Sequence, residues 1–133
     1  MQNEAMKQIV TTDKAPKAIG PYSQAVKSNG FVFLSGQVPS DPRTGAIVGG
    51  SIQQQTERVL ENIKGLLEAA GLTLHHVIKA TVFLKDISHF ADMNQVYAKY
   101  FTAQPPARTT VEVARLPRDV QIEIEVIAVE PSA

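Results

Sequence analysis

The sequence contains no cysteine, and its charges balance. Without cysteine the chain cannot form a disulfide, an iron–sulfur cluster, a cysteine-ligated zinc site or a thiol nucleophile. Its 13 Lys and Arg residues match 13 Asp and Glu residues, and no basic block gathers the cations that neutralise a nucleic-acid backbone. We therefore expect no nucleic-acid partner, and the absence of cysteine fits a reducing compartment.

Long hydrophobic runs are also missing. No segment approaches the roughly 20 apolar residues that a membrane helix needs, and the first residues, MQNEAMKQIVTTDKAPKAIGPYS, lack the apolar stretch of a signal peptide. The sequence therefore predicts a cytoplasmic protein without a membrane partner. With 133 residues, 44% of them hydrophobic, the chain suits one globular domain over residues 1–133, with a mobile start before Lys7. The zero formal charge favours self-association.

The pair Asn29-Gly30 predicts a tight hairpin between two strands. Both residues of a type I′ turn need positive φ, which Asn and Gly tolerate. A two-residue loop fixes the register, so Val26 pairs with Phe33. Because side chains alternate along a strand, one face of the hairpin would carry Tyr22, Gln24, Val26, Phe31, Phe33, Ser35 and Gln37, and the other would carry Ala25, Val32 and Leu34. Both faces have apolar members, so we expect a partner subunit to cover the face that lies away from the helices.

Periodic apolar residues predict two helices. The first spans about 51–70, with Ser51 as its N-cap and Gly71 as a left-handed C-terminal residue. The second spans about 88–101, where Pro105 and Pro106 prevent it from continuing. It would place five apolar side chains on one side: Phe90, Met93, Val96, Tyr97 and Phe101.

Three further strands are predicted at about 77–84, 107–113 and 121–129, from β-branched or alternating residues. The element order is then strand, hairpin, helix, strand, helix, strand, strand. This order is typical of an α+β fold in which two helices cover one face of a mixed β-sheet.

Arg108 follows two prolines in PPARTTVEV, where a strand begins. Alternation puts Arg108 and Glu112 on one face, so an ion pair between them is one interpretation. The last strand, QIEIEVIAVE, favours a functional role instead, because Glu123 and Glu125 lie on a face that must be covered. A buried carboxylate is costly unless it is paired or used. A structural role for these carboxylates would be a cross-strand salt bridge to one of four cations: Lys79, Arg108, Arg115 or Arg118.

Motifs for other chemistry are absent. The adjacent His75 and His76 would point to opposite sides of an extended segment, and no third ligand stands at a recognisable spacing. Ser23 and Ser35 lack a base in a nucleophile motif, and GAIVGG lacks the lysine of a phosphate loop. We therefore expect neither a metal nor a cofactor.

Seven segments together resemble the RidA subgroup of the reactive intermediate deaminase (Rid, YjgF-type) family: IGPYSQAV, FVFLSGQVP, NIKGLLEAAG, VIKATVFLKD, FADMNQVYAKYF, PPAR and IEIEVIAV. The likeness runs from about Lys7 to Glu130, and its most specific part is Glu123, fifteen residues after Arg108. It implies a chorismate-mutase-like fold of the bacillary type. It also implies a homotrimer whose sheets form a central barrel with three intersubunit clefts.

The resemblance implies hydrolysis of reactive 2-imino acids, 2-iminobutanoate and 2-iminopropanoate, to 2-keto acids and ammonia. Arg108 matches the family's carboxylate-binding arginine, and Glu123 matches its water-positioning glutamate. Five further residues match substrate-binding positions of the cleft: Tyr22, Ser35, Gly36, Asn94 and Thr110. Many members have a cysteine where this chain has Thr110, so a regulatory thiol is missing here, whereas a ligand contact through the backbone N–H would survive the exchange.

The pairing of Arg108 with Glu123 raises a chemical difficulty. A neighbouring cation would lower the pKa of Glu123 and weaken it as a base until a substrate carboxylate neutralises the arginine. The alternative function is a non-catalytic trimer that senses a ligand or acts like a chaperone with the same cleft. A chorismate-mutase-type isomerase shares the fold, but an isomerase of a dicarboxylate should need more than one cation in its cleft.

Overall fold

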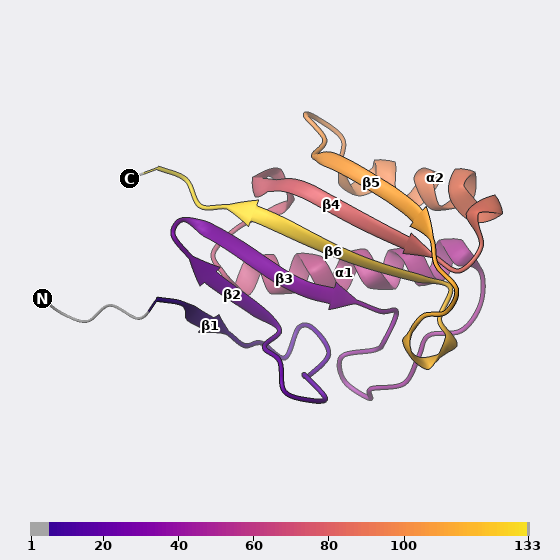
Figure 1. Ribbon diagram of the computed structural model, residues 1–133, viewed down its shortest axis with the longest axis horizontal. Helices are drawn as coiled ribbons and strands as arrows, with labels where there is room; N and C mark the ends of the chain where they lie inside the picture. Colours follow the sequence, from indigo (N-terminus) through magenta and orange to yellow (C-terminus); the bar gives the residue numbers. More distant parts are fainter. Residues whose placement is uncertain (1–5, 133) are drawn as a thin grey trace, which may run out of the picture.

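The computed structural model describes residues 6–132 and has two layers, a six-stranded sheet and a pair of α-helices (Figure 1). The sheet order is β1-β2-β3-β6-β4-β5, in which only β4 and β5 run parallel. These features confirm the predicted α+β class with a mixed sheet. Most of the expected mobile start before Lys7 lies outside the described residues. The elements are β1 (Gln8–Val10), β2 (Ala25–Ser28), β3 (Phe31–Gln37), α1 (Ile52–Ala69), β4 (Val77–Leu84), α2 (Phe90–Tyr100), β5 (Ala107–Glu112) and β6 (Ile122–Val129).

The hairpin of β2 and β3 turns where it was predicted to turn. Asn29 and Gly30 have φ angles of 55° and 84°, and Val26 pairs with Phe33. Both central residues therefore adopt the left-handed conformation that a type I′ turn requires.

A bulge in β3 overturns the predicted face of Gln37. Leu34 pairs with Val126 but Gln37 pairs with Ile124, so β3 has one more residue than β6 between these pairs. The extra residue turns Gln37 onto the helix-covered face, where it is only 6% exposed. The bulge occurs at Ser35 and Gly36, and the strict alternation assumed from the sequence was wrong beyond this point.

Helix α1 begins and ends at the predicted residues. Ser51 and Gln54 form a reciprocal capping box at its start. At its end Gly71 has φ 81°, and the N–H groups of Gly71 and Leu72 donate to the carbonyls of Glu68 and Leu67 at 2.9 and 2.8 Å. This Schellman arrangement needs the positive φ that glycine adopts without strain.

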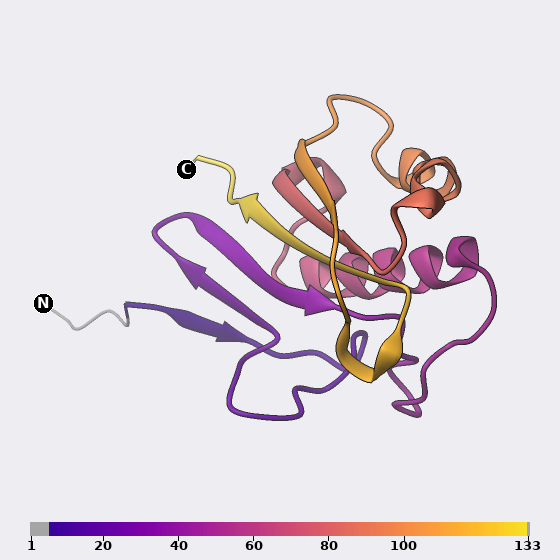
Figure 2. The same ribbon diagram turned by 45° about the vertical axis from the view of Figure 1, so that its right-hand side comes forward.

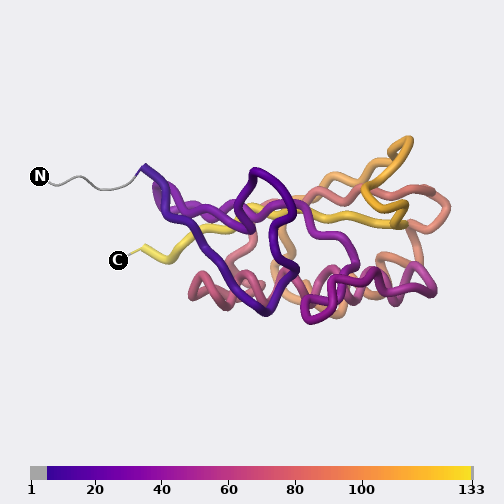
Figure 3. Tube along the Cα trace, turned by 90° about the horizontal axis from the view of Figure 1, so that it is seen from below, coloured from indigo at the N-terminus to yellow at the C-terminus, as the bar shows by residue number. Residues whose placement is uncertain are grey.

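Both helices pack on the same face of the sheet, as Figure 3 shows with the sheet seen edge-on. Figure 2 shows α2 beside β4 and β5, at the edge opposite β1. The core between the layers consists of fully buried aliphatic side chains, among them Val59, Leu60, Ile63, Val82, Leu84, Ile122 and Ile124. None of the helices described is long and apolar enough to cross a membrane.

The other side of the sheet, called the outer face below, has no α-helix over it in residues 6–132. Phe31 and Phe33 lie on it and are 41% and 44% exposed, and Ile9 and Val111 are exposed there too. A sheet face with this many exposed apolar side chains is a candidate interface. The second apolar face predicted from the hairpin is therefore present.

Candidate functional site

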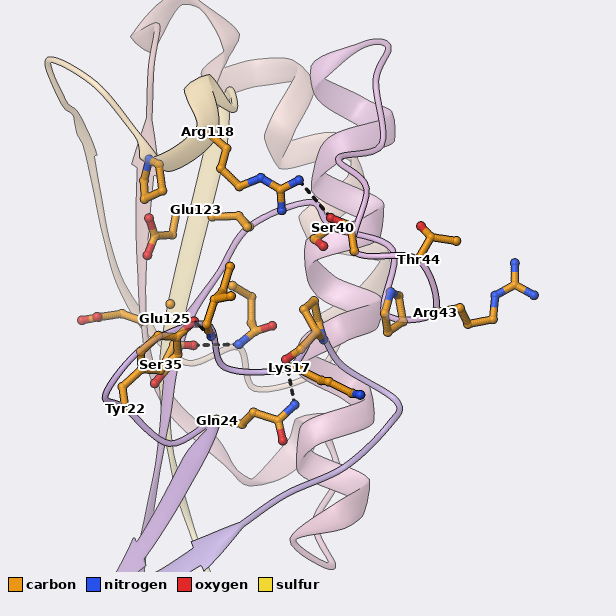
Figure 4. Close-up of a pocket in the computed structure, with 18 residues that line it drawn as sticks. Lys17, Tyr22, Gln24, Ser35, Ser40, Arg43, Thr44, Arg118, Glu123 and Glu125 are labelled. Carbon is orange, nitrogen blue, oxygen red and sulfur yellow. Dashed lines mark hydrogen bonds between the residues drawn. The ribbon is translucent and has the colours of Figure 1, made fainter.

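A cleft of about 1070 Å³ lies where the ends of β3 and β6 meet three loops (Figure 4). Four of the seven predicted site residues line it: Tyr22, Ser35, Gly36 and Glu123. The loops add three cations, Lys17, Arg43 and Arg118. In Figure 4 the side chains of Glu123 and Glu125 point to the same side, and Arg118 extends away from them toward Ser40.

Glu123 lies directly over Gly36. A Cβ added to Gly36 would overlap Oε2 of Glu123 and come within 2.9 Å of its carboxyl carbon. Any other residue at position 36 would displace this carboxylate, and the bulge at Ser35 and Gly36 brings the bare backbone to it. The close approach is a physical reason for a glycine within a strand.

The carboxylate of Glu123 is half-buried and forms no ion pair within residues 6–132. Burial first, and then the charge of Glu125, raises the pKa of Glu123 above its ordinary value. The predicted lowering by Arg108 is not found in the single chain, since that cation is not among the groups that shift this pKa. An unpaired carboxylate with a raised pKa is a stronger base than an exposed one.

Two hydroxyl groups that line the cleft with Glu123 have different hydrogen-bonding roles. The Ser35 hydroxyl donates to the Ser23 carbonyl at 2.6 Å, so its hydrogen is already used and its oxygen can only accept. The Tyr22 hydroxyl accepts from the Ile19 N–H at 3.2 Å, which leaves its own hydrogen free. The Tyr22 side chain is 51% exposed, so this donor is accessible from the cleft.

Arg108 and Asn94 lie together elsewhere, against α2. Nη1 of Arg108 donates to Oδ1 of Asn94 at 2.7 Å. The guanidinium carbon lies 4.7 Å from the ring centre of Tyr97 and 5.4 Å from that of Phe90. The predicted ion pair with Glu112 does not form, because Oε1 of Glu112 accepts from the Ile87 N–H at 2.9 Å instead.

The two predicted catalytic side chains, Arg108 and Glu123, lie on opposite faces of the sheet. Arg108 is in register with Ala80, which is 0% exposed and faces the helices. Glu123 stands between Ile122 and Ile124, which face the helices and are also 0% exposed, so its own side chain points to the outer face. One chain therefore does not bring this arginine and this glutamate together.

Thr110 presents a free backbone donor next to Arg108. Strand β5 is at the edge of the sheet, and the Val113 N–H donates to the Leu84 carbonyl of β4 at 2.9 Å. In a parallel ladder alternate residues bond to the neighbouring strand, so the N–H of Thr110, an odd number of residues away, points to the open edge. A ligand contact through this N–H would not depend on the side chain at position 110.

Sequence reasoning missed the aromatic neighbours of Arg108. Phe90 and Tyr97 were predicted only as members of the apolar side of the second helix, but Phe90 is 39% exposed and both rings contact the guanidinium. The signal was their spacing, since Phe90, Asn94 and Tyr97 recur on one side of a helix. Among residues 6–132, no group of three or more metal-ligating side chains could hold a metal ion.

Comparisons with known proteins identify the family. Residues 12–130 match the family model described as endoribonuclease L-PSP. A RutC family protein of Pyrococcus horikoshii is 61% identical over 123 residues, covering 92% of this chain and 98% of that protein. The 2-iminobutanoate/2-iminopropanoate deaminase of Salmonella typhimurium is 50% identical over 127 residues, covering 93% and 98%.

A solved structure agrees with these sequence relatives. The crystal structure of a protein from Thermotoga maritima, described as a putative endoribonuclease, has a TM-score of 0.93 and 56% identity, and the match covers 96% of this chain and 100% of that one. The resemblance predicted from the seven sequence segments is confirmed, and the chain belongs to the Rid (YjgF) family, whose model bears the description endoribonuclease L-PSP.

Proposed function

We propose that the protein hydrolyses 2-iminobutanoate and 2-iminopropanoate to 2-keto acids and ammonia, in clefts between the subunits of a homotrimer. The observation that carries the proposal is the separation of Arg108 from Glu123. The guanidinium of Arg108 and the carboxylate of Glu123, whose pKa is raised, point to opposite faces of one sheet. Neither group forms an ion pair within residues 6–132. A second copy of the chain can supply the group that the first lacks.

The exposed outer face supports the same assembly. Three sheets packed through their outer faces, in the chorismate-mutase-like arrangement, would bury Phe31, Phe33 and Val111, which are exposed in the single chain. Cyclic assembly repeats one contact between neighbours and closes the ring. Each contact then forms one cleft, and the whole chain acts as a single RidA-like domain.

Substrate binding rests on Arg108. Its planar guanidinium can donate two parallel hydrogen bonds to the carboxylate of a 2-imino acid. Asn94 occupies Nη1, and the other N–H groups remain for the ligand. The backbone N–H of Thr110 at the open strand edge adds a donor beside them. These contacts orient the C=N group without a metal or a cofactor.

Hydrolysis rests on Glu123 of the partner subunit. The ionised carboxylate removes a proton from a water molecule as the water oxygen bonds to the imine carbon, and Glu123 passes this proton to the imine nitrogen. In the resulting carbinolamine Glu123 takes the hydroxyl proton as the C=O bond forms and the C–N bond breaks, and it passes this proton to the departing nitrogen, so the products are a 2-keto acid and ammonia. The free hydrogen of Tyr22 is available to the oxygen or nitrogen of this intermediate.

The proposal is tested by making 2-iminobutanoate in place with a PLP-dependent dehydratase and following ammonia release. We expect faster release with the protein than with buffer, and a trimer by sedimentation velocity. Release no faster than in buffer, together with tight binding of 2-ketobutanoate, would favour the non-catalytic ligand-sensing trimer. A monomer that persists on concentration would remove the intersubunit cleft.

Glu125→Gln is expected to move the acid limb of the pH–rate profile to lower pH. The charge of Glu125 is one cause of the raised pKa of Glu123, and the reaction needs Glu123 ionised, so activity falls as the pH drops through that pKa. Removing the charge lowers the pKa and extends activity toward acid. The measurement is kcat/KM from about pH 4 to about pH 8, with Glu57→Gln on α1 as the charge-matched control. If the acid limb does not move, the charge of Glu125 does not influence the group that acts as the base.

Cleavage of RNA is the second candidate function. The matching family model is described as an endoribonuclease, and the loops around the cleft present Lys17, Arg43 and Arg118, which could contact phosphates. Incubation of single-stranded RNA with wild type and with Glu123→Gln tests this activity. We expect intact RNA in both, and cleavage that disappears in the variant would favour the ribonuclease.

A further inference from the structure

Buried polar atoms without partners occur on the elements that flank Arg108. Within residues 6–132, three buried side-chain atoms have no hydrogen-bond partner: His89 Nδ1, Tyr97 OH and Thr110 Oγ1. His89 directly precedes Phe90, Tyr97 lies against the guanidinium, and Thr110 follows Arg108 on the same face of β5. Buried polar groups without partners are rare and mark sites where packing alone does not explain the residue.

Tyr97 is the most buried of these residues and the closest ring to the guanidinium. It is 6% exposed, its ring centre is 4.7 Å from Cζ of Arg108, and the Phe101 ring supports it at a centroid distance of 4.6 Å. Burial raises the pKa of its phenol, and the Arg108 cation opposes that shift. Tyr97 and Asn94 lie three residues apart on one side of α2, so a single helical turn contacts the guanidinium through both an aromatic ring and an amide oxygen.

All the groups found to hold Arg108 are neutral. A carboxylate partner would hold the guanidinium firmly but would also compete with a substrate carboxylate for the same N–H groups. An amide oxygen and two aromatic faces attract the cation without cancelling its charge. The arginine can therefore be fixed in position and still carry its full charge to a ligand.

We propose that Tyr97 is a positioning residue for the substrate carboxylate, acting through Arg108. The proposal rests on the proposed function, in which Arg108 binds that carboxylate. The Tyr97 ring fixes the plane of the guanidinium, and Asn94 fixes its rotation within that plane. The remaining N–H groups then stay aimed at the open edge of β5 beside the Thr110 N–H, and the ligand need not order a mobile side chain when it binds.

The ring, and not the hydroxyl, carries this role, so two substitutions at one position separate the contributions. Tyr97→Phe keeps the aromatic face and removes an unpartnered hydroxyl, and we expect the Kd for 2-ketobutanoate to stay within about threefold of wild type. Tyr97→Leu removes the face, and we expect that Kd to rise about tenfold, with kcat/KM falling mainly through KM. Calorimetric titration with 2-ketobutanoate, well below the Tm of each variant, supplies the Kd.

Tyr100→Leu is the matched control. Tyr100 is on the same helix, and its hydroxyl donates to Glu61 at 2.7 Å, away from Arg108. We expect it to lower Tm without changing the Kd. The side-chain Nε–H signal of Arg108 in nuclear magnetic resonance gives a readout that does not depend on activity: it should keep its ring-current shift in Tyr97→Phe and lose it in Tyr97→Leu.

The outcomes separate this inference from the function on which it rests. If wild type binds 2-ketobutanoate and hydrolyses the imine while Tyr97→Leu binds equally well, the positioning role of Tyr97 is wrong and the proposed function stands. If wild type neither binds nor hydrolyses, both are wrong. A rise in Kd for Tyr97→Leu that Tyr97→Phe does not share, with Tyr100→Leu unchanged, supports the proposal.

Discussion

Glu123→Gln is expected to lose about 10²–10⁴-fold in imine hydrolysis while it keeps its fold, its assembly and its affinity for 2-ketobutanoate. The amide has the shape of the carboxylate and fits over the bare backbone of Gly36, where an added Cβ would already collide with residue 123. It has no lone pair basic enough to take a proton from water. The measurement is ammonia release from 2-iminobutanoate made in place, beside a calorimetric Kd.

Glu130→Gln is the control for this loss. Glu130 directly follows the same strand and pairs with Lys27 at 3.3 Å, outside the cleft residues. The same chemical change there should leave turnover within a few-fold of wild type, because this partly exposed pair lies outside the cleft and ion pairs near the surface contribute about 0–1 kcal/mol. Turnover of Glu123→Gln at the wild-type level would assign Glu123 a structural role.

The elements that local chemistry decides could be predicted from the sequence. The Asn29-Gly30 turn needs only two residues that accept positive φ, and the capping box of α1 needs only Ser51 and Gln54. The bulge that reverses Gln37 could not be predicted in this way. It arises where β3 pairs with β6, about ninety residues away in the sequence. The residues FVFLSGQ alone do not indicate which strand they pair with.

The two halves of the site differ in the same respect. Ile122 and Ile124 mark the core face of β6, so the outward direction of Glu123 follows from alternation alone. In β5 neither face is clearly apolar, because Ala107, Thr109 and Val111 alternate with Arg108, Thr110 and Glu112. Which face meets the helices is decided by the packing of α2, and the Asn94 and Tyr97 contacts therefore needed the structure.

Arg108→Lys and Arg108→Ala are both expected to lose more than about 10²-fold in kcat/KM. Lysine keeps the charge, but a single ammonium cannot donate to Asn94 and grip a carboxylate in the same plane, so the imine is no longer aligned with the water. Arg115→Lys is the control. Arg115 forms an exposed pair with Asp119 at 2.8 Å, and this exchange should change kcat/KM by less than about threefold. Equal catalysis in wild type and Arg108→Ala would contradict the proposed deaminase function.

Mixing the two inactive variants tests where Arg108 and Glu123 meet. The two variants, Glu123→Gln and Arg108→Ala, are mixed in equal amounts, unfolded together and refolded. If a cleft takes Arg108 from one subunit and Glu123 from the next, the refolded mixture should regain about one quarter of wild-type activity. Each variant supplies the group that the other lacks, and random assembly orders them correctly at about one cleft in four. A site within one chain would regain nothing, because every chain carries one defect. Arg108 faces the helices and Glu123 points to the outer face of the same sheet. We therefore expect the mixture to regain about one quarter of wild-type activity.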